Sequence, residues 1–427
     1  MRSSQAICAV LVGISLLGAV NVAAQKVGNA PTPTVQTQPV VLPTPIKATK
    51  NSFFQPADFK LLGTLEVKDK ETVTFDTGTV DTAPKISGVK TEDGELGVST
   101  SGVVQVAVFA FDKISIARGA KVEVKGDRAL VLLSSGEVAI DATIDLSGKI
   151  GPRVPTSAGG TAGPGAEGGE HGAALKSNPP PPGGGDGGPA CKDNGVWGRG
   201  FGAGMNKRCL GGSAGGGGAY GGAGGSASEG SPINGGNKRV FAMPGGVVYG
   251  DAALTELLGG SGGAGGSNDR GYDNASGGGG GGAIAIISLK EISIGAIGRI
   301  SVAGGKGAEN KACGGGGSGG AIMLVAPTIK LAEGAVLDAQ GGAGGDAGPK
   351  VVDEIKPEIT RRWLGSGGGG GGGRIALYSN DDFGTKGDDK IETTLPKGVT
   401  VAGGKGGTAA KDGADGSFYD GNWPELK

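Results

Sequence analysis

Short runs of alternating apolar and polar residues recur along the chain, and glycine or polar residues separate them. One block holds three such runs between residues 283 and 302, and similar blocks lie at residues 129–146 and 321–339, with a partial copy at 374–401. Alternation over about four residues is typical of a β-strand with one buried face. A repeat that cannot bury its own apolar face has to stack on its neighbours. The pattern therefore predicts an all-β protein built from repeated three-strand coils.

Aligning the blocks places aliphatic side chains in columns that run from coil to coil. Each coil takes about 20 residues, which suits one turn of a three-sided parallel β-helix. We therefore expect a right-handed parallel β-helix of about five short coils over residues 103–379. The predicted columns are Leu130, Ile284, Ile322 and Ile375; Leu132, Ile286, Leu324 and Leu377; and Val122, Ile144, Ile300, Leu337 and Val399.

Glycine runs interrupt the coils at one corner, after the third strand of a coil and before the next first strand. The insertions cover residues 149–282, 304–320 and 341–373, and 95 of the 427 residues are glycine. Two arrangements fit this composition. Glycine loses much conformational entropy on ordering, which favours mobile loops, but extended polyglycine segments can also pack side by side.

One stretch inside the first insertion has helical character. Asp251 is a good N-cap, the leucines at 254, 257 and 258 share a helical face, and Gly259 is a suitable stop. We expect a two-turn helix here that docks on the coils.

The segments on either side of the predicted coils have other compositions. Residues 1–24 read as a secretory signal, with Arg2, an apolar stretch and a small-residue cleavage site. Residues 25–50 are a Pro/Thr-rich linker. Residues 51–102 are expected to form a small N-terminal β cap, and residues 380–427 a C-terminal closing segment. We therefore expect a secreted protein, extracellular or on the outer cell surface, without a transmembrane segment after signal cleavage.

Charge and histidine content exclude several classes of function. The chain has 40 Lys and Arg against 41 Asp and Glu, so no basic surface for nucleic acid is indicated. His171 is the only histidine, which excludes metal sites that need two. No cofactor is indicated.

Cysteine and calcium patterns give two weaker predictions. Cys191 and Cys209 lie in one glycine-rich segment, and a disulfide between them is plausible in an oxidising compartment, with Cys313 left over or pairing with one of the two. Residues 341–346 match a single calcium-type GGxGxD repeat that ends at Asp346. Calcium sites of this kind need tandem copies, so one copy is a weak signal.

Several motifs together resemble a known kind of protein. GGGGGGAIAI, GGGGSGGAIMLVAPT, GGGGGGGRIALY, YGDAALTELLGGSGG and EVAIDATIDLSG look like the glycine-rich secreted β-helix proteins of myxobacteria and related bacteria. The resemblance covers residues 103–378. Most members of that family have no assigned activity, so the resemblance implies a surface or matrix role and no catalytic residues.

A row of polar residues on the outside of the predicted coils is the main candidate for chemistry. It contains Glu123, Asp145, Ser301, Asp338 and Thr400. Two strand steps would separate Asp145 from Asp338 by roughly 10 Å, near the separation in inverting glycosidases. A strand exposed on one face also carries outward polar residues for solvation alone.

The preferred hypothesis is a non-catalytic structural or adhesive protein that displays glycine-rich loops to cell-surface or matrix glycans or proteins. The alternative is a carbohydrate-active β-helix enzyme, a lyase or glycoside hydrolase, that uses Asp145, Asp338 and Glu123. Ice binding would require a regular threonine row, which Thr400 alone does not supply.

Overall fold

The structure is a computed structural model, and all the residues it describes belong to one compact unit, residues 42–427. It describes residues 53–79, 81–91, 96–101, 104–151, 200–204, 213–229, 243–266, 275–309, 312–347, 365–383, 395–424 and 426. Among these residues the regular elements are all β-strands apart from one 3-10 turn, η1 (Pro56–Asp58). The predicted signal and linker lie outside the described residues.

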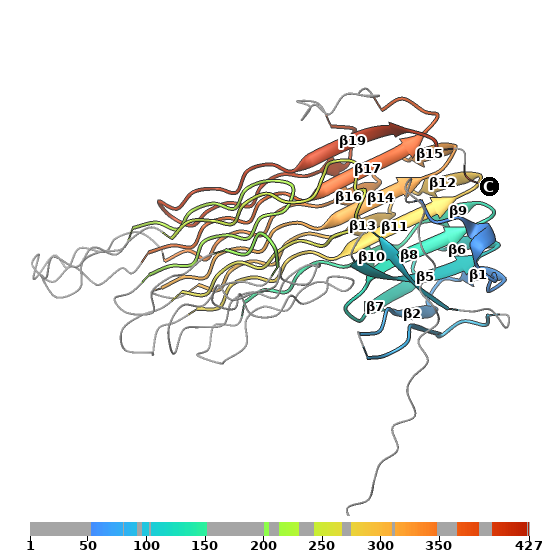
Figure 1. Cartoon of the computed structure of the whole chain (residues 1–427), viewed down its shortest axis with the longest axis horizontal. Coiled ribbons are helices and arrows are strands. Elements are labelled where there is room, and N and C mark those ends of the chain that lie inside the picture. Colours follow the sequence, from blue (N-terminus) through green and yellow to red (C-terminus); the bar gives the residue numbers. More distant parts are fainter. Residues whose placement is uncertain are drawn as a thin grey trace, which may run out of the picture. The chain divides into compact units, whose positions relative to one another are not determined.

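Strands follow one another in a repeating order through separate sheets (Figure 1). Three consecutive coils each supply three strands: β8 (Ala129–Ser134), β9 (Val138–Ile140) and β10 (Thr143–Asp145); β11 (Ala283–Ser288), β12 (Glu291–Ile294) and β13 (Arg299–Ser301); β14 (Ala321–Val325), β15 (Thr328–Leu331) and β16 (Val336–Asp338). The first strand of each coil joins sheet A, the second sheet B and the third sheet D. All these neighbours pair in parallel.

Further strands extend the sheets at both ends. Before β8 come β1 (Thr64–Val67), β2 (Thr72–Asp76), β3 (Lys85–Ser87), β4 (Gly97–Ser101), β5 (Val104–Phe111), β6 (Lys113–Ile116) and β7 (Lys121–Lys125), and after β16 come β17 (Arg374–Ser379), β18 (Val399–Thr400) and β19 (Ser417–Asn422). Sheet A has the order β19-β17-β14-β11-β8-β5-β4, sheet B β1-β6-β9-β12-β15, sheet C β3-β2-β7 and sheet D β10-β13-β16-β18.

The terminal segments do more than cover the coils. Within residues 51–102, antiparallel β3 and β4 close two sheets at the N-terminal end, but β1 and β2 add parallel strands to the stack. Within residues 380–427, β19 adds one more parallel strand to sheet A. The stacked strands therefore extend beyond both boundaries predicted from the sequence.

The strand registers confirm the predicted aliphatic columns except at Val122, which lies on β7 in sheet C, and among the described strands no register joins β7 to Ile144. Leu130, Ile284, Ile322 and Ile375 are direct partners across four strands of sheet A, and Leu132 begins a second such column two residues along. In sheet D the column from Ile144 to Val399 is also in register. These side chains form one buried core between the sheets, so each coil buries its apolar face on the next.

Sheet A is buried on its outer face as well, which its continuous apolar runs require. Small residues such as Ala283, Ala285 and Ala321 lie on that face with larger aliphatic side chains. Leu254, Leu257 and Leu258 pack against them and are almost fully buried.

The predicted helix at residues 251–258 is wrong, although its docking on the coils is confirmed. The segment forms turns, and Leu254 has a φ of 53°, which a right-handed helix does not allow. The body of the protein holds the backbone: Ser101 Oγ accepts the Leu257 N–H at 2.9 Å, and the Tyr378 hydroxyl donates to Ala253 O. Two helical turns are too short to form alone, so tertiary contacts decide the conformation.

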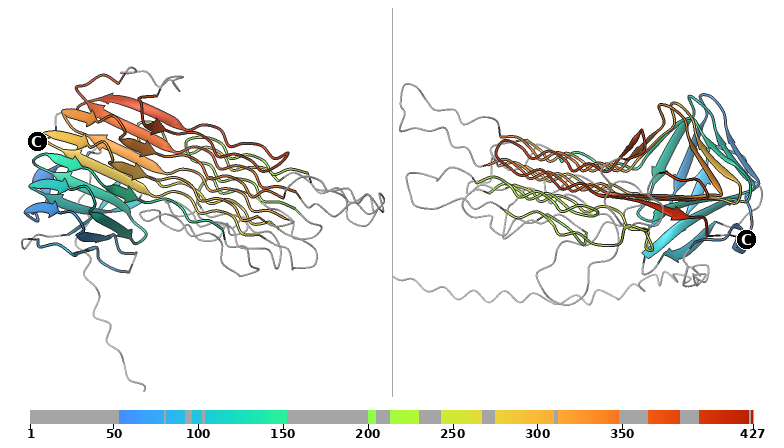
Figure 2. Two further views of the ribbon diagram at one scale, coloured as in Figure 1. Left: turned by 180° about the vertical axis from the view of Figure 1, so that it is seen from behind. Right: turned by 90° about the horizontal axis from the view of Figure 1, so that it is seen from above.

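The glycine-rich segments are ordered and lie side by side (Figures 1 and 2). We call a segment outbound where it leaves a sheet D strand and inbound where it leads to a sheet A strand. We call the whole set the glycine bundle. Its described outbound segments are 146–151, 302–309, 339–347 and 401–407, its inbound segments are 275–282, 312–320, 365–373 and 411–416, and further segments are 200–204, 213–228, 243–248 and 259–266.

Hydrogen bonds in the glycine bundle repeat every three residues. In the inbound segment 312–320, Gly314, Gly317 and Gly320 donate to the outbound segment 302–308, while Gly316 and Gly319 donate to residues 368–371. The N–H groups of Gly315 and Ser318 donate to residues 261–264, and that of Cys313 donates to Gly365. Carbonyls of this segment accept from residues 218, 278–281 and 342–345. Three residues per turn without internal hydrogen bonds is the geometry of a polyproline II-type helix. The segment therefore has six neighbours, and of the two arrangements left open by the sequence, the packed one is observed.

Close backbone packing explains why these positions are glycine. A Cβ atom on Gly370 would lie 1.9 Å from the carbonyl oxygen of Gly317, and one on Gly315 would lie 2.0 Å from that of Gly216. Both obstacles are backbone atoms of hydrogen-bonded neighbours, which cannot move independently. Any side chain here would push two segments apart.

Gly370→Ala is expected to lower the free energy of unfolding by about 3 kcal/mol, the upper range for overpacking. Ala343→Ser is the matched control, because Ala343 lies half-exposed on the outer side of the same bundle. Its effect should stay within about 0.5 kcal/mol. Urea unfolding followed by far-UV circular dichroism measures both, and equal effects would contradict the packed bundle.

Candidate functional site

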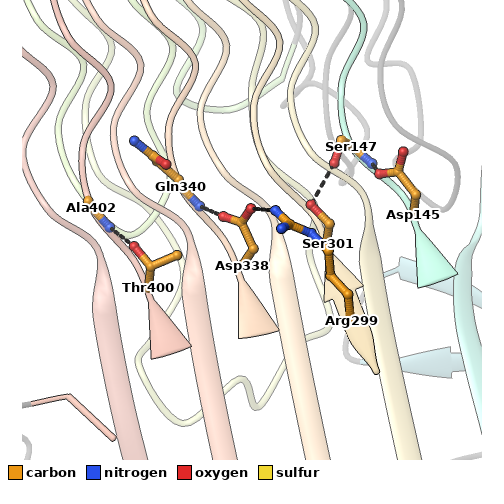
Figure 3. A network of polar contacts seen from close by, with 8 residues as sticks. All are labelled: Asp145, Ser147, Arg299, Ser301, Asp338, Gln340, Thr400 and Ala402. Carbon is orange, nitrogen blue, oxygen red and sulfur yellow. Dashed lines mark hydrogen bonds and ion pairs between the residues drawn. The ribbon is translucent and has the colours of Figure 1, made fainter. Parts of the chain in front are cut away.

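The predicted polar row is present where sheet D meets the glycine bundle (Figure 3). Asp145, Ser301, Asp338 and Thr400 are direct register partners on β10, β13, β16 and β18. They alternate with the buried column that contains Ile300 and Leu337, so their side chains point away from the core. Each of the four is the last residue of its strand.

Three of these residues make the same local contact with the backbone. The Ser147 N–H donates to Asp145 Oδ1 at 2.9 Å, the Gln340 N–H to Asp338 Oδ1 at 3.1 Å, and the Ala402 N–H to Thr400 Oγ1 at 3.4 Å. A side-chain oxygen that accepts an N–H two residues ahead turns the backbone locally. These side chains therefore guide the chain from a strand into an outbound segment.

Asp338 also has a charged partner. Arg299 Nη2 donates to Asp338 Oδ2, and the Asp338 side chain is 10% exposed while that of Arg299 is 44% exposed. Between the coil of β10 and that of β13, the Ser147 and Ser301 hydroxyls hydrogen-bond at 2.9 Å. Hydrogen bonds thus connect the row both along the chain and between neighbouring coils, and the charge of Asp338 is paired with that of Arg299.

Glu123 lies on a different sheet from the other candidates. It is on β7 in register with Thr74. Lys121 Nζ lies 2.6 Å from its carboxylate and Lys125 Nζ 3.4 Å. The hydrogen bond from Lys121 holds the pKa of Glu123 below its usual range. Among the described strands, no register joins β7 to β10, so the place of Glu123 in the row stays a prediction.

The geometry of the row offers little for hydrolysis of a glycan. Two strand steps separate Asp145 and Asp338, roughly 10 Å, with Ser301 between them. Acid–base catalysis needs two carboxyl groups facing a bound sugar, whereas Asp145 and Asp338 both accept backbone N–H groups and Asp338 is paired with Arg299. A small cavity of about 110 Å³ in the described region reaches only Thr400 of this row, and its other lining residues are Leu395, Val401, Ala402, Asp415, Gly416 and Phe418.

Asp346, the candidate calcium ligand, bonds to protein groups instead. Its Oδ1 accepts the Thr408 N–H at 3.1 Å and the Ser366 hydroxyl at 3.3 Å. Among the described residues, no three His, Cys, Asp or Glu side chains come together as metal ligands would. Here the carboxylate links an outbound segment to its neighbours.

The predicted disulfide between Cys191 and Cys209 lies outside the described residues. Cys313 is fully buried in the glycine bundle. Its carbonyl accepts the Gly215 N–H at 2.9 Å, so its backbone belongs to the same lattice as the glycines around it.

A buried cluster around Arg374 was not predicted from the sequence. Arg374 donates to Ser417 Oγ and to Tyr249 O, both at 2.8 Å, and its guanidinium lies 5.2 Å from the centre of the Tyr220 ring. Burial raises the pKa of both the Tyr220 and Tyr249 phenols, so both stay neutral. The signal was a charged residue at the start of an otherwise apolar strand, directly after a glycine run.

Asp338→Ala is expected to lower the free energy of unfolding by about 2 kcal/mol, because it removes a charged partner of Arg299 and the acceptor of the Gln340 N–H. Asp145→Ala removes one exposed contact and should cost about 0.5 kcal/mol. Urea unfolding of both variants measures the difference. Equal losses would show that the Arg299 pair contributes nothing.

Comparisons with known proteins leave the family open. No protein-family model, curated protein or solved structure matches the chain significantly. In the part of the chain that the structure describes, no helix has the length and apolarity to span a membrane.

Proposed function

We propose that the protein is a secreted or cell-surface structural and adhesive protein without catalytic activity, built on a right-handed parallel β-helix. The handedness follows from the general preference of parallel crossover connections, which are right-handed in about 98% of cases. The observation that carries the proposal is the ordered glycine bundle, in which buried backbone groups of neighbouring segments satisfy one another.

The hydrogen-bonded order of the bundle favours a role as a rigid scaffold for the connections between its segments. A mobile glycine loop would lose binding energy when a partner ordered it. Segments held on several sides by hydrogen bonds have already lost that entropy during folding. The connections between outbound and inbound segments thus start and end on a fixed base.

Engagement of the candidate carboxylates in structural contacts supports the non-catalytic part of the proposal. Asp338 is paired with Arg299, Asp145 and Asp338 both bond to the backbone, and Glu123 is held between two lysines. Partners on this hypothesis are glycans or proteins of a cell surface or matrix. The resemblance to glycine-rich secreted β-helix proteins of myxobacteria agrees with this role and stays a prediction.

The connection at residues 348–364 allows a test of adhesion. The Ala347 N–H donates to Ser366 Oγ at 3.2 Å, so the two ends of this connection lie together at the end of the bundle. Replacing residues 348–364 with a short Gly-Ser linker should preserve folding and reduce binding to a glycan array or to immobilised cell-wall material. Far-UV circular dichroism controls for folding. A folded variant that binds as well as the wild type would exclude this connection as the adhesive element.

The alternative function is a carbohydrate-active lyase or glycoside hydrolase that uses Asp145, Asp338 and Glu123. The separation of Asp145 from Asp338 is the observation in its favour. We expect the purified protein to release no reducing ends and no unsaturated products from a panel of polysaccharides. Activity that Asp145→Asn abolishes, with the fold intact, would establish the enzyme and reject the structural proposal.

A further inference from the structure

One edge of the glycine bundle carries backbone groups that have no backbone partner among the described residues. The last outbound segment, 401–407, bonds to three neighbours: the Gly404 N–H donates to Gly370 O, Gly404 O accepts the Gly413 N–H, and Lys405 O accepts the Gly344 N–H. Because bonding directions repeat every three residues, the backbone groups of Gly403 and Gly406 share one direction, which differs from that of Gly404. In the described part of the chain, neither has a backbone partner there.

The last inbound segment, 411–416, lies beside segment 401–407 and forms part of the same edge. Lys411 and Ala414 donate to residues 226 and 223, and Gly413 and Gly416 donate to residues 404 and 401. The backbone groups of Asp412 and Asp415 take the third direction and have no backbone partner among the described residues. Both aspartates are exposed to solvent.

Two carboxylates accept the N–H groups of Gly403 and Gly406, which have no backbone partner in the described part of the chain. Asp415 Oδ1 accepts the Gly403 N–H at 2.9 Å, and Asp412 Oδ1 accepts the Gly406 N–H at 2.8 Å. Gly403 and Gly406 are three residues apart, as are Asp412 and Asp415. Each carboxylate therefore binds an N–H group on a successive turn of segment 401–407. Lys405 Nζ binds the other oxygen of Asp412 at 2.8 Å and fixes its orientation.

Such an edge resembles the edge strand of a β-sheet, whose unpaired backbone groups attract another chain. The bundle already contains parallel neighbours, such as 314–320 beside 368–371, and antiparallel ones, such as 314–320 beside 302–308. A further segment would therefore fit in either direction. The edge itself consists of two antiparallel segments, so it is self-complementary about a two-fold axis.

We propose that Asp412 and Asp415 keep this edge of the glycine bundle closed, and that without them it pairs with the same edge of a second copy of the chain. The partner is a second copy because it presents the same three-residue repeat of N–H and C=O groups. In the wild type, the carboxylates occupy the N–H donors that an approaching edge would need.

The test is the double variant Asp412→Ala/Asp415→Ala, studied by sedimentation velocity over a wide range of concentrations. We expect its weight-average mass to rise with concentration towards twice that of the wild type under the same conditions. Asp412→Asn/Asp415→Asn keeps an acceptor oxygen for each N–H and should remain close to the wild type. If the alanine variant sediments as the wild type does at all concentrations, the proposal is wrong.

A second double variant controls for charge. Glu137→Ala/Glu333→Ala removes two exposed carboxylates that pair with Lys113 and Lys397 on the coils and cap no N–H of the bundle. Either double alanine variant changes the formal net charge from −1 to +1. Association of this control would assign the effect to charge and overturn the proposal.

Hydrogen exchange gives a readout that does not depend on mass alone. In the alanine variant at low concentration, the amides of residues 401–416 should exchange faster than in the wild type, and slow again as concentration rises. Peptides from sheet A report whether the coils remain folded. Association without renewed protection of residues 401–416 would place the contact elsewhere and reject this edge as the interface.

Discussion

The need to pair every buried peptide group governs the glycine-rich half of this protein. A polyproline II-type segment makes no hydrogen bonds within itself, so each N–H and C=O has to find a partner on another segment. With three residues per turn, the N–H groups point in three directions and the C=O groups in three others. A segment such as 312–320 is therefore satisfied only when neighbours surround it. Glycine is required because a Cβ at such close approach would meet a neighbour's carbonyl, as at Gly370. In the described segments, the glycine content therefore reflects close packing of the backbone.

The coils supply the order that such a bundle needs. Neighbouring strands of a sheet lie about 4.8 Å apart, and each outbound segment continues directly from a sheet D strand whose register is fixed. Asp145, Asp338 and Thr400 act at this transition, because each binds the N–H two residues ahead, where the strand ends. The polar row thus has a structural explanation: it sets the direction in which the chain enters the bundle.

The sequence predicted the parts of the fold that side chains encode. The columns of Ile284, Ile322 and Ile375 followed from alternation, because a strand's inward positions are set by a period of two. The helix at residues 251–258 failed because local capping signals were overridden by burial of Leu254 against sheet A. The partners of individual glycines could not be predicted, since the pairing of Gly316 with Gly368 depends on neighbours far away in the chain.

One signal of the bundle was nonetheless present in the sequence. Ala303, Lys306 and Glu309 are spaced by three, and the same spacing recurs in the other outbound segments at Gln340, Ala343 and Asp346, and at Ala402, Lys405 and Thr408. The structure places these residues on the outer side, where they are exposed or half-exposed, while most glycines between them are buried. A period of three in the non-glycine residues therefore marks the polyproline II-type geometry, as a period of two marks a strand.

The same geometry limits where recognition can occur on this protein. Most inward positions of the bundle are glycines without room for a side chain, as at Gly370 and Gly315, so they carry no binding groups. Side chains remain possible at every third outer position, at the junction with sheet D, along the edge near Asp412, and in the connections between segments. At the junction, the polar groups of Asp338 and Arg299 are already paired with each other. Outer positions alternate small residues such as Ala303 and Ala343 with charged ones such as Lys306, whose partner is Glu309. Under the proposed function, a partner is therefore best sought in the connections between segments.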